Sequence, residues 1–230
     1  MSASPKNMLH PIASTQSHRA PYAENQAPLI LRIGFWICIA IAVAVVLRRL
    51  VALAHPSSSG PPQTVGLDQL FASHATLTLA HIVPALAFVL LVPFAVFRRF
   101  SNLVWPERLL FPLGAVVGLT AYGMSIYPVG GWIERSAVLF YDSLFLFSLG
   151  RAWFYKLRGD SRLKSRWMIR AVVVLLGIAT TRPVMGVFFA TSRITHLTFH
   201  QFFGIAFWIG FTINWIVVEA WLYLRRPATM

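Results

Sequence analysis

The chain has 230 residues and a formal net charge of +13 at pH 7, but only 12% of its residues are charged and 57% are hydrophobic. Because globular chains contain about 25% charged residues, this composition excludes an ordinary soluble domain. It also disfavours nucleic-acid binding, since the basic residues stand at the ends of apolar segments and in short loops, as they do in membrane proteins. We therefore expect a multi-pass membrane protein.

Residues 1–27 are rich in Pro, Ser, Ala and Gln and lack the apolar period of a helix. Such a segment cannot bury enough apolar surface to fold by itself, so we predict a disordered tail. No short basic stretch leads into an apolar core with a cleavage site, which argues against a secretory signal.

Six apolar segments of membrane length follow within residues 28–226. A transmembrane α-helix needs about 20 apolar residues to cross about 30 Å of hydrocarbon. We therefore predict an all-α bundle of six transmembrane helices, separated by loops such as the Pro-, Ser- and Gly-rich segment 56–62. The predicted spans are residues 30–51, 76–97, 109–127, 136–154, 167–189 and 197–224.

Two spans have features that predict local structure. In the third, Gly114 and Gly118 form a small-xxx-small pattern, which favours close approach of another helix. In the fifth, the segment 180–183 (Thr-Thr-Arg-Pro) predicts a break, because Pro183 has no amide hydrogen to donate to the carbonyl of Ala179.

The distribution of basic residues predicts that both termini are cytoplasmic. Of the 20 Lys and Arg residues, only five then fall on the outer side: Arg48, Arg49, Arg135, Arg182 and Arg193. Positive charge gathers on the inner side of membrane proteins, so this bias supports that orientation, with the Arg48-Arg49 pair as a local exception. Trp residues flank the spans as an interfacial belt requires, at positions 105, 132, 153 and 167.

Ionisable side chains inside the spans are the candidate functional residues, since such groups are costly in hydrocarbon. At about 1.5 Å per helical residue, four of them lie about 5–10 Å below the outer surface. These four are His81, Asp142, Arg182 and His200, with His74 and His196 at the rim above them. Their shared depth predicts one outward-facing polar site.

The histidines in this layer suggest a cofactor. His196 and His200 are four residues apart and should share a helical face, as should His74 and His81 if their helix begins early enough. Neutral imidazoles can bind a metal or act as axial ligands of haem b. We expect His81 and His200 to be the ligands, with His74 and His196 as alternates. The only cysteine, Cys38, forms no CxxCH motif, which excludes covalent c-type haem.

Arg182 or Arg193 could neutralise a haem propionate, and a quinone is a further possible ligand. A membrane redox partner would then be needed for electron transfer.

Other interpretations stay open. Asp142 and Arg182 could form a buried ion pair that holds helices together, with Asn214 and Glu219 as further structural polar residues. Glu219 lies near the inner surface and is expected to pair with inner arginines. The protein would then be a non-catalytic membrane subunit or assembly factor. A small-solute or proton transporter is a third possibility, suggested by Asp142 and the proline in the fifth span.

No nucleophile elbow, phosphate-binding loop or HExxH motif is present, so hydrolysis and phosphoryl transfer are disfavoured. Substrate and reaction stay open.

Residues 75–226 resemble an uncharacterised bacterial family of integral-membrane proteins, domain of unknown function 2306. The resemblance depends on short motifs: Ala80-His81-Ile82-Val83-Pro84, Glu107-Arg108 through Gly114, Arg166-Trp167-Met168-Ile169-Arg170, Arg182, and Asn214 with Glu219. It implies a membrane fold but no reaction. Proteins of this family often have histidines in the cytoplasmic loops where this chain has Glu107 and Lys164, so a site that needs those histidines is not expected here.

Overall fold

The structure is a computed structural model that describes residues 28–55, 62–96 and 104–225; the tail predicted at residues 1–27 lies outside them. The described residues form helices joined by short turns and contain no strand, which confirms the all-α prediction. The helices are α1 (Leu29–Ala54), α2 (Pro62–Ser73), α3 (Ala75–Val96), α4 (Val104–Met124), α5 (Gly131–Leu157), α6 (Ser161–Leu175), α7 (Gly177–Thr195) and α8 (Phe199–Leu224).

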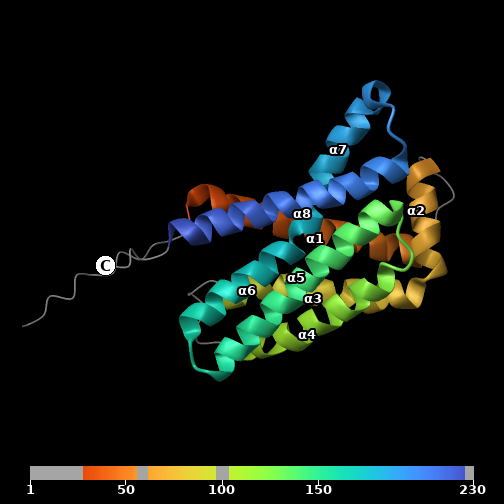
Figure 1. Cartoon of the computed structure of the whole chain (residues 1–230). Coiled ribbons are helices and arrows are strands. Elements are labelled where there is room, and N and C mark those ends of the chain that lie inside the picture. Colours follow the sequence, from red (N-terminus) through yellow and green to blue (C-terminus); the bar gives the residue numbers. More distant parts are fainter. Residues whose placement is uncertain (1–27, 56–61, 97–103, 226–230) are drawn as a thin grey trace, which may run out of the picture.

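The long helices run up and down in one bundle, in which α1 begins and α8 ends at the same end (Figure 1). The closest neighbours are the sequential pairs α3 with α4, α5 with α6, and α7 with α8, and α5 also packs along α8. We call the end where α1 begins the arginine-rich end, because Arg32, Lys164, Arg166, Arg170 and Arg225 lie there. The other end, which carries α2, is called the α2 end.

Five helical stretches are long and apolar enough to cross a membrane: α1, α3, α5, the continuous stretch of α6 and α7, and α8. The chain is therefore a multi-pass membrane protein. The predicted third span corresponds to α4, which is not one of the five, so a sixth span stays a prediction. Large apolar side chains are exposed on the bundle, as expected for contact with lipid; Leu119 and Leu224 are 67% and 81% exposed.

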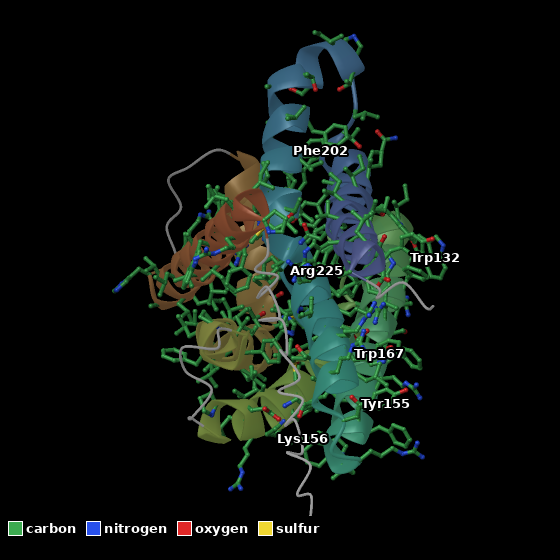
Figure 2. The ribbon with its side chains drawn as sticks, turned by 90° about the vertical axis from the view of Figure 1, so that its left-hand side faces the viewer. Trp132, Tyr155, Lys156, Trp167, Phe202 and Arg225 are labelled. Carbon is green, nitrogen blue, oxygen red and sulfur yellow. The ribbon has the colours of Figure 1, made fainter. Side chains whose placement is uncertain are left out.

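The aromatic side chains at the helix ends are arranged as an interfacial belt would be. Trp132 lies in the first turn of α5 and Tyr155 in its last turn, and Trp167 lies in α6; all three are labelled in Figure 2. Trp132 is 71% exposed. The side chain of Trp105, also expected in the belt, lies outside the described side chains.

Helix α2 was not expected from the sequence. It begins with Pro62, which suits the first helical turn because that amide needs no partner. Its Asp68 accepts hydrogen bonds from both Arg48 and Arg49 of α1. Both arginines, which the sequence placed on the outer side as exceptions, are thus neutralised in part by a neighbouring carboxylate.

The fifth predicted span is broken earlier than expected. The break lies at Leu176, between α6 and α7, while Pro183 stands inside α7. Gly177 follows the break, and a Cβ atom there would overlap the ring of Phe211 on α8. Asn214 braces the break, because its Nδ2 donates to the Val173 carbonyl at 3.2 Å and its Oδ1 accepts from Thr180 at 2.7 Å. Contact with α8 therefore decides where this span bends.

The glycines of α4 bring it close to α5, as the small-xxx-small pattern predicts. A Cβ atom on Gly114 would lie 2.7 Å from the side chain of Leu149, and one on Gly118 would overlap Leu146. Another side of α4 packs on α3, where His81 contacts Val117 and Thr120.

Candidate ligand cavity

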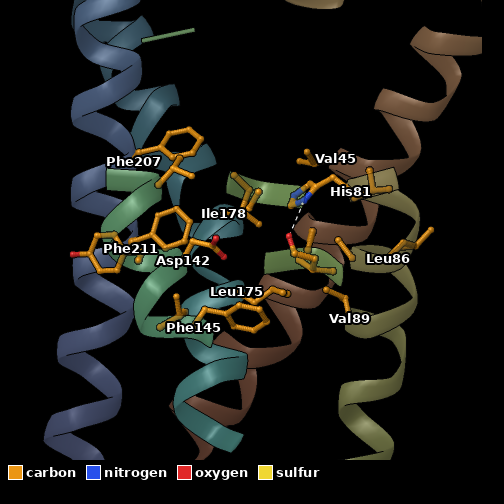
Figure 3. Close-up of a pocket in the computed structure, with 18 residues that line it drawn as sticks. Val45, His81, Leu86, Val89, Asp142, Phe145, Leu175, Ile178, Phe207 and Phe211 are labelled. Carbon is orange, nitrogen blue, oxygen red and sulfur yellow. Dashed lines mark hydrogen bonds between the residues drawn. The ribbon is translucent and has the colours of Figure 1, made fainter. Parts of the chain in front are cut away.

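A cavity of about 180 Å³ lies in the middle of the bundle, walled by residues of every helix except α2 (Figure 3). Its wall is almost entirely apolar and includes Val45, Leu86, Phe145, Ile178 and Phe211. Two ionisable side chains, His81 of α3 and Asp142 of α5, also line it, and Figure 3 shows them on facing sides. An apolar cavity with a few convergent polar groups is the usual form of a ligand site.

The imidazole of His81 is held in one orientation and one tautomer. Its Nδ1 lies 3.2 Å from the Val117 carbonyl oxygen and 3.0 Å from the Thr120 hydroxyl, both on α4. Because a carbonyl oxygen only accepts, Nδ1 carries the hydrogen and Nε2 is left as an acceptor. Nε2 makes no hydrogen bond with the described residues and is free to meet a ligand.

Asp142 is the second polar group of the cavity. It is only 8% exposed, and its Oδ2 has no hydrogen-bond partner among the described residues. Buried polar atoms almost always have a partner, since an unsatisfied one costs free energy. An unsatisfied carboxylate oxygen beside a cavity therefore indicates a ligand that completes the site.

The expected ion pair between Asp142 and Arg182 is not formed, although both residues are described. The Arg182 Nη1 instead lies 3.8 Å from the Met185 sulfur, and its Nε is buried without a partner. Arg182 does not line the cavity. An ion pair with Arg182 therefore does not explain why a carboxyl group is buried at position 142.

Arg182 belongs to a second polar group, nearer the α2 end. It interacts electrostatically with the like charges of Arg49 and Arg48 and with the opposite charge of Glu134 on α5, and Glu134 also interacts with His200. The Glu134 carboxylate accepts from the Gly130 amide at 2.6 Å, and His200 Nδ1 donates to the Val129 carbonyl. Glu134 was not predicted as a site residue because the predicted fourth span began at Ser136. An acidic residue two positions before a membrane span could have indicated it.

The two rim histidines occupy helix ends and do not enter the cavity. His196 has a left-handed backbone (φ 51°) as the C-cap of α7, so it lies outside α8 and does not share a helical face with His200, contrary to expectation. His74 immediately precedes α3, and its carbonyl accepts from the Thr78 amide at 2.9 Å, so it closes the first turn of the helix that contains His81. It stacks on Tyr127 with ring centroids 3.8 Å apart. The side chain of Arg193 lies outside the described side chains.

The predicted site residues are thus divided between two places. His81 and Asp142 line the cavity, whereas Arg182 and His200 gather around Glu134. Within the described part of the chain, no three His, Cys, Asp or Glu side chains are grouped so that they could hold a metal ion.

At the arginine-rich end, the acidic residues Glu107 and Glu219 are paired with basic side chains. Glu219 binds Arg170 with two hydrogen bonds, one of them 2.9 Å long, which confirms the expected partner type. Glu107 binds Lys164 at 2.9 Å and Lys156 at 3.4 Å. Burial opposes ionisation of Glu107, but the two ammonium groups outweigh it and hold the pKa of Glu107 below its ordinary value.

No family model matches this chain, and no curated protein or solved structure is significantly similar to it. The function is therefore inferred from the geometry of the site.

Proposed function

We propose that this multi-pass membrane protein binds the ring of a lipid-soluble quinol in its central cavity and takes part in membrane redox chemistry. The observation that carries the proposal is a pair of acceptors without protein partners, His81 Nε2 and Asp142 Oδ2, in one apolar cavity. A quinol ring has hydroxyl donors on opposite edges and is otherwise apolar. It is chemically complementary to this cavity.

The size of the cavity supports a single ring. An apolar cavity of roughly 150 Å³ holds one benzene molecule. The cavity around His81, at about 180 Å³, has room for one substituted six-membered ring. It is only partly enclosed, so the isoprenoid tail of a quinol can extend toward the lipid.

Both acceptors have the chemistry that quinol oxidation needs. Oxidation of the diol to the quinone releases two protons and two electrons. His81 accepts one proton at Nε2, and Asp142 accepts the other when its carboxyl group is ionised; the electrons pass to a redox centre of a membrane partner protein. Removing bulk water from the site strengthens these hydrogen bonds.

Haem b, ligated by His81 and His200 with Arg182 at a propionate, is the competing proposal. In its favour, both imidazoles direct Nδ1 to a backbone carbonyl, which orients a ring for coordination through Nε2. However, the cavity suits one ring rather than a macrocycle, and neither His200 nor Arg182 lines it. A Soret band in the oxidised and reduced purified protein would favour haem over the quinol.

The binding test uses purified protein in detergent with a short-chain ubiquinol analogue, measured by quenching of tryptophan fluorescence. His81→Phe and Asp142→Asn should each weaken binding about tenfold, because the first removes an acceptor of a desolvated hydroxyl and the second replaces a carboxylate with a weaker, neutral amide acceptor. His196→Gln is the control, since His196 lies outside the cavity. Equal affinities in all four proteins would contradict the proposal.

The same variants distinguish the other functions suggested by the sequence. In a non-catalytic subunit or assembly factor, the cavity variants would reduce folding or partner retention and bind no quinol. In a transporter, they would change flux of a solute or proton across vesicles. The proposed location is the bacterial inner membrane, as the family resemblance implies, and the proposed cytoplasmic position of both termini follows from the Lys and Arg distribution.

A further inference from the structure

A second hollow, separate from the central cavity, lies between α1, α6 and α8 near the arginine-rich end. Its volume is about 250 Å³. We call it the α1–α8 groove. Its wall is largely apolar and includes Phe35, Val172 and Val218. None of the proposed quinol ligands lines it.

The unsatisfied polar groups of this groove stand at one end of it. Arg32 of α1 and Trp221 of α8 both lie three residues from the helix ends at the arginine-rich end. Arg32 is exposed, and its side chain forms no ion pair with the described residues. The Trp221 Nε1 is buried and has no hydrogen-bond partner there. Because indole nitrogen only donates, this atom points to a ligand with an acceptor oxygen.

The deep end of the groove has no unsatisfied polar group. Asn214 lines it, but both ends of its amide are bonded to Val173 and Thr180. From Trp221 to Asn214 the groove extends along α8 by seven residues, or about 10 Å. A molecule complementary to the groove has a hydrogen-bond acceptor at the end near Trp221 and an apolar chain of about 10 Å that extends toward Asn214.

The mouth of the groove is positively charged. The Arg225 guanidinium lies 4.5 Å from the centre of the Trp221 ring, and Arg166 Nη2 donates to the Leu222 carbonyl at 2.9 Å. Arg170 is neutralised by Glu219, but Arg32 carries a further charge at the mouth. This surface is complementary to an anionic head group.

We infer that the α1–α8 groove is a binding site for an anionic phospholipid. The phosphate accepts from the Arg32 guanidinium and the Trp221 Nε1–H, and one acyl chain lies in the groove toward Asn214. The basic mouth and the apolar interior together favour a lipid over a soluble phosphate, because a soluble phosphate has no apolar chain to fill the groove.

Gly34 permits a steric test of this site. It lines the groove, and a Cβ atom placed on it meets nothing within 4 Å. Gly34→Leu therefore fills the groove without disturbing the packing of α1. Gly150 of α5 is equally open but lies outside the groove, so Gly150→Leu is the matched control.

The experiment is native mass spectrometry of the detergent-purified protein incubated with equal amounts of phosphatidylglycerol and phosphatidylcholine. The wild type should retain one phosphatidylglycerol in preference. Arg32→Gln should reduce that preference about fivefold, which corresponds to one basic residue at a membrane surface. Gly34→Leu should abolish retention of both lipids, whereas Gly150→Leu should match the wild type. Trp221→Phe should lower retention while preserving the fold.

Two outcomes would overturn the site. One is an unchanged lipid preference in Arg32→Gln and Gly34→Leu proteins whose thermal unfolding matches the wild type. The other is loss of phosphatidylglycerol retention in the presence of excess inorganic phosphate, which would indicate that the site binds a soluble anion. Quinol binding in the central cavity is unaffected by either outcome.

Discussion

Carboxylates occur in two different settings in this bundle. At the arginine-rich end, Glu107 and Glu219 each have basic partners on other helices. In the central cavity, Asp142 has an oxygen without any partner among the described residues. Arg182, the partner expected from the sequence, instead contacts the Met185 sulfur. Paired carboxylates hold helices together, whereas an unpaired one beside a cavity is costly unless a ligand uses it.

The presence or absence of a basic partner therefore distinguishes carboxylates that hold helices together from the carboxyl group that we assign to a ligand site. Glu107 and Lys164 illustrate this, because they form an ion pair with each other. Substitutions at the two settings should consequently change stability in opposite directions.

The largest effect is expected for Glu219→Gln. It leaves Arg170, whose side chain is 12% exposed, without its carboxylate. We expect unfolding in detergent to become easier by about 1–3 kcal/mol, less than for a fully buried pair because Glu219 is one-third exposed. Thermal unfolding by circular dichroism measures this. The double variant Arg170→Met, Glu219→Leu should regain most of the loss; no recovery would mean that the pair is not what stabilises this contact.

Asp142→Asn should have the opposite sign. Replacing a buried carboxyl group that has no partner with a neutral amide of the same shape should leave the free energy of unfolding unchanged or raise it by about 1 kcal/mol, while weakening quinol binding. The same unfolding experiment applies. A destabilisation as large as that of Glu219→Gln would show that Asp142 has a structural partner, and the comparison would fail.

The pH dependence of stability should come in part from Glu107. Its pKa is lowered in the folded protein by Lys164 and Lys156, against an ordinary value of 4.5. The stabilisation is therefore present above pH 4.5 and is lost as pH falls through the lowered pKa. The melting temperature should fall over this acidic range, and less steeply in Glu107→Gln. Identical slopes for both proteins would exclude this contribution.

The smallest effect is expected for Thr120→Val. It removes one of the two groups near His81 Nδ1 but leaves the Val117 carbonyl as acceptor. The tautomer is then retained, so quinol affinity should drop only about twofold, in line with one weak neutral hydrogen bond. Titration of the quinol analogue measures it. A loss as large as in His81→Phe would mean that Thr120 itself contacts the ligand.

Several features followed from local pattern alone. The apolar segments matched five membrane-length helical stretches, and the Gly114 and Gly118 spacing predicted the close packing of α4 on α5. His81 and Asp142 were identified by the cost of an ionisable group in an apolar span. These are properties of short segments, for which residue type and helical rise are sufficient information.

Depth alone did not group the candidate residues correctly. His81 and His200 were predicted at a similar level, but a level in the membrane says nothing about direction around a helix, and only His81 lines the cavity. His196 was separated from His200 by a left-handed residue at a helix end, which spacing cannot reveal. Glu134 was overlooked because its partners, the Gly130 amide and Arg182, are set by the turn before α5 and by α7.

The sequence by itself determined the class of this protein, the approximate spans and the identity of the unusual polar residues, because hydrophobicity and helix length are additive along the chain. The tertiary structure decided which of those residues meet. Pairing Glu219 with Arg170, leaving Asp142 without Arg182 and bending the fifth span at Gly177 against Phe211 all depend on how helices rotate and pack against one another. Rotation and packing are properties of the whole bundle rather than of any one segment.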